Sequence, residues 1–175
     1  MIIDNKIRLR EKRLDDALND YTWKTDHELA RLDAVPQLTM TFSQYLPNYA
    51  SELRYSSSTS HPFAVEVLDG KHIGNCVYYG VDKTKGEAEL GVMIGNRDYW
   101  EKCYGADAVT TLVRYIFSQT NLNRIYLKTL DWNIRAQKCF QKCGFIPYGH
   151  MVRDGFNFVL MEIHDKQWEE HKIKI

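Results

Sequence analysis

The sequence predicts one α+β domain over residues 1–175, with a mixed, mostly antiparallel sheet flanked by helices. Short strand patterns separated by turn signals fill the middle of the chain, and two stretches with helical periodicity follow on either side of a further strand. A strand that returns through a helix usually pairs in parallel with the strand before it. Residues 124–130 are therefore expected to lie parallel to residues 87–94.

The first third of the chain carries one strand pattern and three helical patterns. The expected elements are a strand at 7–10, a helix toward Trp23 capped by Asp15 or Asp16, a helix at 27–32 capped by Asp26, and a helix at 42–55. Pro36 follows the second helix as a stop signal. The polar run at 56–60 is expected to be a connector.

The next segment predicts an antiparallel meander. Apolar residues alternate with others from Phe63 to Leu68, and Asp69-Gly70 is a strong signal for a hairpin turn. The returning strand is expected at 73–79. A looser turn through 82–86 then leads into a strand at 87–94.

Helical periodicity dominates the last part of the chain. The two sets of residues at i, i+3, i+4 and i+7 are Val109, Leu112, Val113 and Ile116, and then Ala136, Cys139, Phe140 and Cys143. Residues 124–130 form the strand pattern between them, and Gly144 suits the end of the second helix. A closing hairpin is expected around Arg153-Asp154-Gly155, with its strands at 151–152 and 156–163.

Composition argues against several classes of partner. Lys and Arg number 23, as do Asp and Glu, so no overall charge draws the chain to nucleic acid or to a membrane. The N-terminus lacks the pattern of a signal peptide, and no apolar run has the length of a membrane span, so a cytoplasmic location is expected. The four cysteines and six histidines lack the spacing of a zinc site, so no metal is predicted.

The segment Asn96–Ala106 joins a predicted strand to a predicted helix. A turn of this kind directs several unpaired backbone N–H groups at one point, and the helix dipole adds partial positive charge there. The segment is therefore a candidate site for a phosphate or pyrophosphate group. The alternative is a helix start that binds no ligand.

In this order, these segments resemble the GCN5-related N-acetyltransferase (GNAT) superfamily, and most closely its branch that acetylates ribosomal-protein N-termini and small amines. Glu87–Ile94 is similar to the family's central strand, Asp98–Ala108 to its pyrophosphate loop and helix start, and Asn133–Phe145 to the helix that follows. The resemblance implies an N-acetyltransferase that uses acetyl-CoA as cosubstrate. It also implies that the two parallel strands splay apart around the pantetheine arm of the cofactor.

The resemblance further implies which residues bind the cofactor. Met93 and Ile94 would contact the pantetheine arm through their backbone, so burial of their side chains does not exclude the role. The pyrophosphate would lie on the amides of Lys102, Cys103, Tyr104, Gly105 and Ala106, with the Lys102 ammonium free to add charge. Asn133 would contact the cofactor and also cap its helix. Phe140 would pack against the pantetheine arm or the core.

Two positions in the loop depart from the pattern of the family. Cys103 stands where the family has a small residue, and Glu101 stands where its closest branch often has glycine. A Cβ at Cys103 limits the positive φ that glycine allows and crowds the phosphate. A carboxylate at Glu101 would repel a phosphate by about 1 kcal/mol at about 4 Å in water. The loop is therefore expected to be weakened, not abolished.

Attack on a thioester needs a neutral amine, so a base is expected to take its proton. Glu89 is the candidate, because it lies on the strand leading to the loop, where the resemblance often places a carboxylate. Glu87 shares its face by strand alternation and fits a solvated side chain equally well. Family members often protonate the leaving thiolate with a Tyr seven residues after the helix-opening Asn. That position is Phe140 here, so no general acid is assigned.

Several functions remain open at this point. The first is acetyl transfer to a protein N-terminus or small amine, and the second is acylation of an amino sugar or antibiotic. The third is CoA binding with weakened or lost catalysis. The acceptor is expected near the helices between Leu14 and Tyr55 and the hairpin at 153–155, with Asp131 and Trp132 as weaker candidates at its border. The sequence also leaves a homodimer open.

Overall fold

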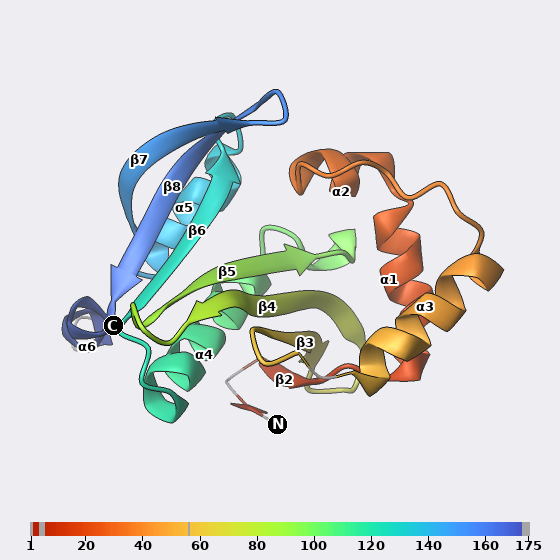
Figure 1. Ribbon diagram of the computed structural model, residues 1–175, viewed down its shortest axis with the longest axis horizontal. Coiled ribbons are helices and arrows are strands. Elements are labelled where there is room, and N and C mark those ends of the chain that lie inside the picture. The colour runs from red at the N-terminus through yellow and green to blue at the C-terminus, as the bar shows by residue number, and fades with distance from the viewer. Residues whose placement is uncertain (1, 4–5, 56, 173–175) are drawn as a thin grey trace.

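The computed structural model describes residues 2–3, 6–55 and 57–172, and these form one sheet with helices around it (Figure 1). The strand order is β1-β2-β3-β4-β5-β6-β8-β7. In the described residues every neighbouring pair is antiparallel except β5 and β6, which are parallel. The predicted mixed sheet with one parallel pair is therefore confirmed.

The strands are β1 (Ile2–Ile3), β2 (Ile7–Glu11), β3 (Ser60–Val67), β4 (His72–Asp82), β5 (Glu87–Ile94), β6 (Arg124–Leu130), β7 (Ile146–Arg153) and β8 (Phe156–His164). The α-helices are α1 (Ala17–Lys24), α2 (His27–Leu32), α3 (Phe42–Arg54), α4 (Tyr104–Gln119), α5 (Ile134–Lys142) and α6 (Asp165–Lys172). Short 3₁₀ turns, η1 (Leu14–Asp16) and η2 (Arg97–Tyr99), precede α1 and α4. In the part of the chain that the structure describes, no helix is long and apolar enough to cross a membrane.

Most predicted elements are present, and the differences have local causes. The strand predicted around 151–152 begins earlier, at Ile146, because β7 is an exposed edge strand whose side chains do not alternate between a core and solvent. Helix α6 was not predicted. Ser56, the first residue of the predicted connector, lies outside the described residues, and Ser60 already belongs to β3.

The two faces of the sheet differ in chemistry. Because side chains alternate along a strand, Leu9, Leu90 and Leu127 point into one core, where the fully buried residues of α4 cover them. The neighbouring positions carry polar side chains on the opposite face, among them Glu89 on β5 and Lys128 on β6. The apolar face thus stabilises the fold, and the polar face is left for chemistry.

A buried ionic network attaches the start of α1 to the polar face. The Arg10 guanidinium on β2 donates to both oxygens of Asp16 at 2.7 and 2.8 Å and to Glu66 at 2.5 Å. Lys12 pairs with Asp20 of α1 at 2.7 Å. Asp16 holds the predicted N-cap position of α1 but makes no capping hydrogen bond, because its carboxylate accepts from Arg10 and from the backbone N–H of Arg13 instead.

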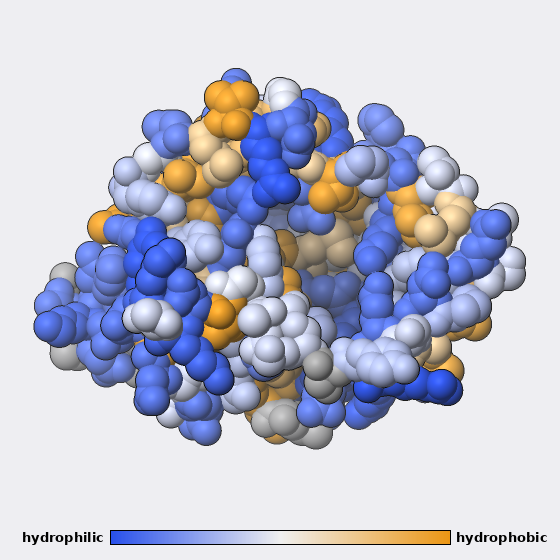
Figure 2. Space-filling model, viewed as in Figure 1, coloured by the Kyte–Doolittle hydropathy of each residue, from blue (hydrophilic) through white to orange (hydrophobic). Residues whose placement is uncertain are grey.

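Helix α2 lies above the region where β5 and β6 separate (Figure 1). Its predicted cap is confirmed, because Asp26 accepts a hydrogen bond from the backbone N–H of Leu29 at 2.9 Å. Asp33 follows the last residue of the helix as its C-cap. The space-filling view shows the surface hollowed beneath this helix (Figure 2).

Candidate active site

The parallel strands β5 and β6 pair over a short stretch and then part. Their register joins Glu87 to Arg124, Ala88 to Ile125 and Glu89 to Tyr126. Beyond Glu89, β5 continues to Ile94 without pairing with β6, and the two strands visibly diverge in Figure 1. The splayed pair is therefore confirmed, and it presents strand backbone that an extended ligand can pair with.

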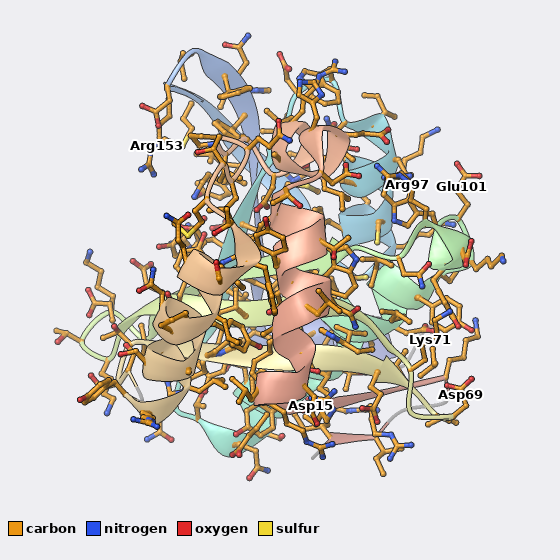
Figure 3. All side chains as sticks on the ribbon, turned by 90° about the vertical axis from the view of Figure 1, so that its right-hand side faces the viewer. Asp15, Asp69, Lys71, Arg97, Glu101 and Arg153 are labelled. Carbon is orange, nitrogen blue, oxygen red and sulfur yellow. The ribbon has the colours of Figure 1, made fainter. Side chains whose placement is uncertain are left out.

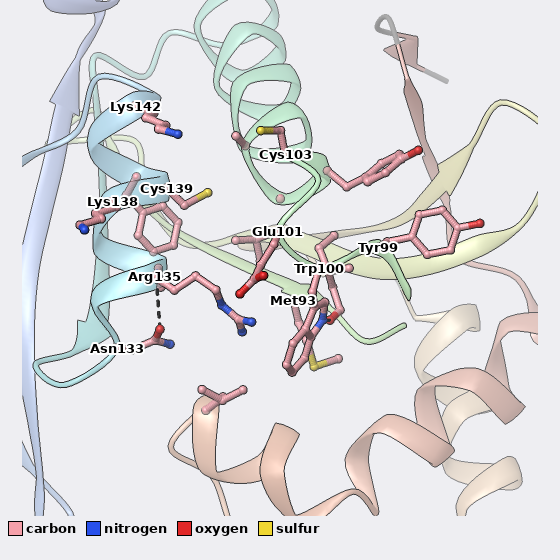
Figure 4. Close-up of a pocket in the computed structure, with 18 of the residues that line it drawn as sticks. Met93, Tyr99, Trp100, Glu101, Cys103, Asn133, Arg135, Lys138, Cys139 and Lys142 are labelled. Carbon is pink, nitrogen blue, oxygen red and sulfur yellow. Dashed lines mark hydrogen bonds between the residues drawn. The ribbon is translucent and has the colours of Figure 1, made fainter. Parts of the chain in front are cut away.

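A cavity of about 350 Å³, here called the loop cavity, opens where the strands part (Figure 4). It is lined by the end of β5, by residues 99–106 and by α5, with the end of α2 opposite. The residues predicted to bind the cofactor that line it are Met93, Ile94, Cys103, Tyr104, Gly105, Ala106, Asn133 and Phe140. The structure thus brings eight of the nine together around one space.

Lys102 is the exception. It does not line the loop cavity, and its ammonium donates to the backbone carbonyl of Asp98 at 2.7 Å. The expectation that this ammonium is free to add charge to the pyrophosphate site is therefore wrong. The side chain instead holds the turn before α4 in place.

The loop contains two strained residues. Glu101 has φ of 59° and Cys103 has φ of 68°, both in the left-handed region that favours glycine. Cys103 is also the N-cap of α4, and its side chain makes no capping hydrogen bond. The positions that the sequence marked as departures from glycine are thus the ones where the backbone adopts a glycine-like conformation.

Helix α5 supplies cations to the loop cavity. Arg135, Lys138 and Lys142 all line it. The Arg135 guanidinium lies 4.1 Å from the ring centroid of Trp100, whose indole N–H donates to the carbonyl of Ile94 at 2.6 Å. The spacing 135, 138 and 142 is a helical i, i+3, i+7 pattern, so the shared face was readable from sequence.

These cations counter the charge of Glu101. In Figure 4 the Glu101 side chain points toward Arg135 across the loop cavity. Cys139, on the same helix, also lines the cavity. The loop cavity is therefore lined by two carboxylates, Glu101 and Asp33, and by three basic side chains of α5, so its local charge balance favours an anion.

Asn133 and Phe140 hold the predicted positions on α5. The Asn133 side chain accepts from the backbone N–H of Ala136 at 3.1 Å, so it caps the helix as predicted. Phe140 is buried, and its ring packs edge-on against Phe145 with centroids 6.1 Å apart. Both residues also line a second cavity.

The second cavity, here called the strand cavity, has a volume of about 490 Å³ and contains Glu89. The Glu89 carboxylate forms an ion pair with Lys128 of β6 and accepts a hydrogen bond from Tyr79 of β4. Burial, followed by this hydrogen bond, raises the pKa of Tyr79. Glu87, on the same face, pairs instead with Arg124 at 2.5 Å outside the cavity, so only Glu89 faces a ligand space.

The rest of the strand cavity comes from two distant segments. Residues 32–36, which follow α2, form one wall, and Arg153 and Asp154 of the β7–β8 turn form another. The predicted use of the N-terminal helices and the closing hairpin agrees with these walls. Asp131 and Trp132 do not line the cavity, and Arg31 stacks over the exposed Trp132 ring at 4.6 Å instead.

The two cavities adjoin, because some residues line both. They share six lining residues, which are Leu32, Asp33, Val92, Asn133, Ala136 and Phe140. In Figure 3, Arg153 and Glu101 mark opposite sides of the molecule. One ligand can therefore enter from the loop side and another from the hairpin side, and they can meet at the shared residues. Within the described ranges, no group of three His, Cys, Asp or Glu side chains could hold a metal ion.

Comparison with known proteins agrees with this geometry. A family model described as "Acetyltransferase (GNAT) domain" matches residues 6–146. An uncharacterized N-acetyltransferase p20 of Bacillus licheniformis is 25% identical over 150 residues, which are 85% of this chain and 83% of the relative. A spermidine N(1)-acetyltransferase of Vibrio cholerae is 27% identical over 94 residues, 54% of each chain.

Solved structures share the fold. The spermidine N-acetyltransferase of Vibrio cholerae in complex with CoA and spermine superposes with a TM-score of 0.84 at 18% identity, covering 95% of this chain and 99% of that one. An aminoglycoside acetyltransferase in complex with coenzyme A and kanamycin gives a TM-score of 0.77 at 21% identity, with 95% and 99% coverage. At these identities the likeness establishes the fold.

Proposed function

The chain belongs to the GNAT acetyltransferase family, and we propose that it acetylates a small primary amine that enters through the strand cavity. As a member of this family it is an acetyl-CoA-dependent N-acetyltransferase. The observation that carries the proposal is the junction of the two cavities. One cavity has the features of a cofactor site, and the other has room for a second substrate beside a carboxylate.

The loop cavity accounts for the cofactor. The pyrophosphate would lie on the amides at the start of α4, where the helix dipole and the cations Arg135, Lys138 and Lys142 favour an anion. The pantetheine arm would follow β5 at Met93 and Ile94, which pair with β4 but not with β6, toward Phe140. The thioester would then reach the residues shared by both cavities.

The strand cavity accounts for the acceptor. Spermine and kanamycin, the molecules bound in the two solved structures, both carry several amino groups. Here the acceptor amine would approach between the Glu89 strand and the segment 32–36. A protein N-terminus and an amino sugar are the alternatives, since a cavity of about 490 Å³ excludes neither.

The chemistry follows from the groups present. The amine nitrogen attacks the thioester carbonyl, the C–N bond forms and the C–S bond breaks. Glu89 is the first candidate for the proton acceptor, because it is the carboxylate of β5 that faces the acceptor space. Phe140 has no proton to donate, and a thiolate with a pKa near 8.5, the value of a cysteine, leaves without a dedicated acid.

Calorimetry with acetyl-CoA followed by a thiol-release assay tests the proposal. The assay would use spermidine, kanamycin and a peptide with a free N-terminus as acceptors. We expect acetyl-CoA to bind and at least one small amine to release CoA. Absence of cofactor binding at millimolar acetyl-CoA would contradict the assignment of the loop cavity. Turnover of the peptide alone would contradict the proposed acceptor class.

A further inference from the structure

The residues shared by the two cavities surround the place where the thioester and the amine must meet. Five of the six are Leu32, Val92, Asn133, Ala136 and Phe140, none of which ionises. Among the described residues that line both cavities, only Asp33 carries an ionisable side chain. Its position at the end of α2 places a carboxylate at the junction itself.

Building on the proposed function, we infer that Asp33 is the catalytic base: its carboxylate binds the ammonium form of the acceptor at the junction and takes the first proton. Glu89 then stays paired with Lys128 and shapes the electrostatics of the strand cavity. Strand position alone would instead assign Glu89 as the base.

The first argument is that the Asp33 carboxylate lacks a partner. Within the described part of the chain no hydrogen bond or ion pair reaches it, and the residue is exposed where it lines the cleft. The other carboxylates of the strand cavity are engaged, Glu89 with Lys128 and Asp154 with Arg153 at 3.2 Å. An unpaired carboxylate in a partly enclosed cleft is a strong site for an ammonium ion.

The second argument is proton affinity. Although Asp33 is exposed by its accessible surface, the walls of the cleft partly desolvate its carboxylate and raise its pKa, against the opposing charges of Lys24 of α1 and Lys128 of β6. The remaining charged or titratable groups of the strand cavity are Tyr79, Glu89, Arg153 and Asp154. A base works best when its proton affinity approaches that needed at working pH, so a raised value suits the role.

Glu89 is in the opposite situation. Its carboxylate pairs with the Lys128 ammonium and accepts a hydrogen bond from the hydroxyl of Tyr79. Glu89 is therefore less free than Asp33 to bind the ammonium of the acceptor. The ion pair between Glu89 and Lys128 keeps the strand cavity polar near the junction.

The third argument is the cost of placing Asp33 where it lies. It is the C-cap of α2, next to the negative end of the helix dipole, where a cation is normally preferred. A carboxylate there, without a partner, lowers the stability of the fold. Residues kept at such a cost are commonly found at functional sites.

The step balances without further groups. The ammonium gives one proton to Asp33 and becomes a nucleophile, which attacks the carbonyl carbon. As the C–S bond breaks, the second proton of the nitrogen passes to the departing thiolate and yields the CoA thiol. Asp33 then releases its proton to water. No separate general acid is needed, which is consistent with Phe140 at the position of the family's Tyr.

The test compares D33N, D33E, E89Q and D69N in the thiol-release assay, with saturating acetyl-CoA and the best acceptor of the panel, from about pH 6 to about pH 10. Asp69 is the matched control, because it is an exposed aspartate on the β3–β4 turn that lines neither cavity. At pH 7 an amine of pKa near 10.4 is neutral in roughly 0.04% of molecules. D33N is therefore expected to lower kcat/KM by about 10³-fold, with the residual rate rising about tenfold per pH unit. D33E is expected to restore part of the flat pH profile, and D69N to stay within about twofold of the wild type.

The outcomes separate this inference from the proposed function. D33N should still bind acetyl-CoA and melt at or above the wild-type temperature, so a loss of rate would not reflect misfolding. If D33N keeps the wild-type rate and pH profile, or if E89Q shows the loss and the slope instead, the assignment of Asp33 is wrong while the acetyltransferase stands. If the wild type releases thiol with no amine of the panel, both proposals fall together.

Discussion

Replacing Cys103 with glycine should stabilise the protein and tighten cofactor binding. Cys103 has φ of 68° and ψ of 2° at the N-cap of α4, and a Cβ in this left-handed region costs about 1–2 kcal/mol. Glycine removes that cost but adds about 0.4–1 kcal/mol of chain entropy to the unfolded state. The side chain is exposed and makes no capping hydrogen bond, so little packing is lost.

The expected net gain is about 0.5–1 kcal/mol, which corresponds to a rise in Tm of roughly 1–4 °C for a chain of this size. The amides of the loop should also approach the pyrophosphate more closely once the Cβ is gone. A gain of about 1 kcal/mol there would lower the Kd for acetyl-CoA about fivefold. Thermal unfolding followed by circular dichroism and calorimetry with acetyl-CoA measure the two effects.

Cys103→Ala is the matched control, because alanine removes the sulfur and keeps the Cβ. We expect it to leave both Tm and Kd close to wild type. A Cys103→Gly protein that melts lower than the alanine variant would show that the left-handed conformation costs less than reasoned. Unchanged or weaker acetyl-CoA binding in the glycine variant would show that the Cβ does not crowd the site.

Three further predictions follow from other parts of the structure. Arg135→Ala should weaken acetyl-CoA binding about tenfold, and by a smaller factor at high salt. The control Lys83→Ala, on the exposed β4–β5 turn, should leave binding unchanged. Calorimetry at two ionic strengths measures both. Gly74→Ala should destabilise the fold by about 1–3 kcal/mol in urea, because its Cβ would lie 2.2 Å from the carbonyl oxygen of Met93. Burial raises the pKa of Asp16, but hydrogen bonds from Arg10 and Arg13 outweigh this effect and hold the pKa at about 2. The ionised carboxylate therefore contributes about 2 kcal/mol of stability above pH 4, and this contribution should be lost as the pH falls through 2. In acid unfolding, Asp16→Asn should lack this loss.

Much of the fold could be predicted because its signals are local. Alternation along the strands marks the apolar face of the sheet, and the i, i+3, i+4, i+7 pattern marks α4 and α5. Asp26 and Asn133 cap helices as expected, since a cap involves only residues two or three positions away. The parallel pairing of β5 and β6 also followed, because a strand–helix–strand connection has few alternatives.

The loop at the start of α4 was equally predictable from the sequence. A strand that runs into a helix must leave backbone amides directed at one point, whatever the side chains are. The departures from glycine at Glu101 and Cys103 were visible as residue types, and the structure gives both positions the left-handed backbone that makes them costly. The direction of the Lys102 side chain could not be predicted from the sequence, since its contact with the Asp98 carbonyl depends on the turn of η2.

The sequence by itself determined the layered fold, the splayed strand pair and the helix start that faces it, because each depends on the order and periodicity of neighbouring residues. Only the tertiary structure decided which carboxylates form ion pairs and which lie at the junction of the two cavities. Glu89 meets Lys128 across 39 positions of sequence, and Asp33 comes to the junction because α2 lies over the parted strands. Such contacts depend on strand register and on the placement of a whole helix, and no local pattern records either.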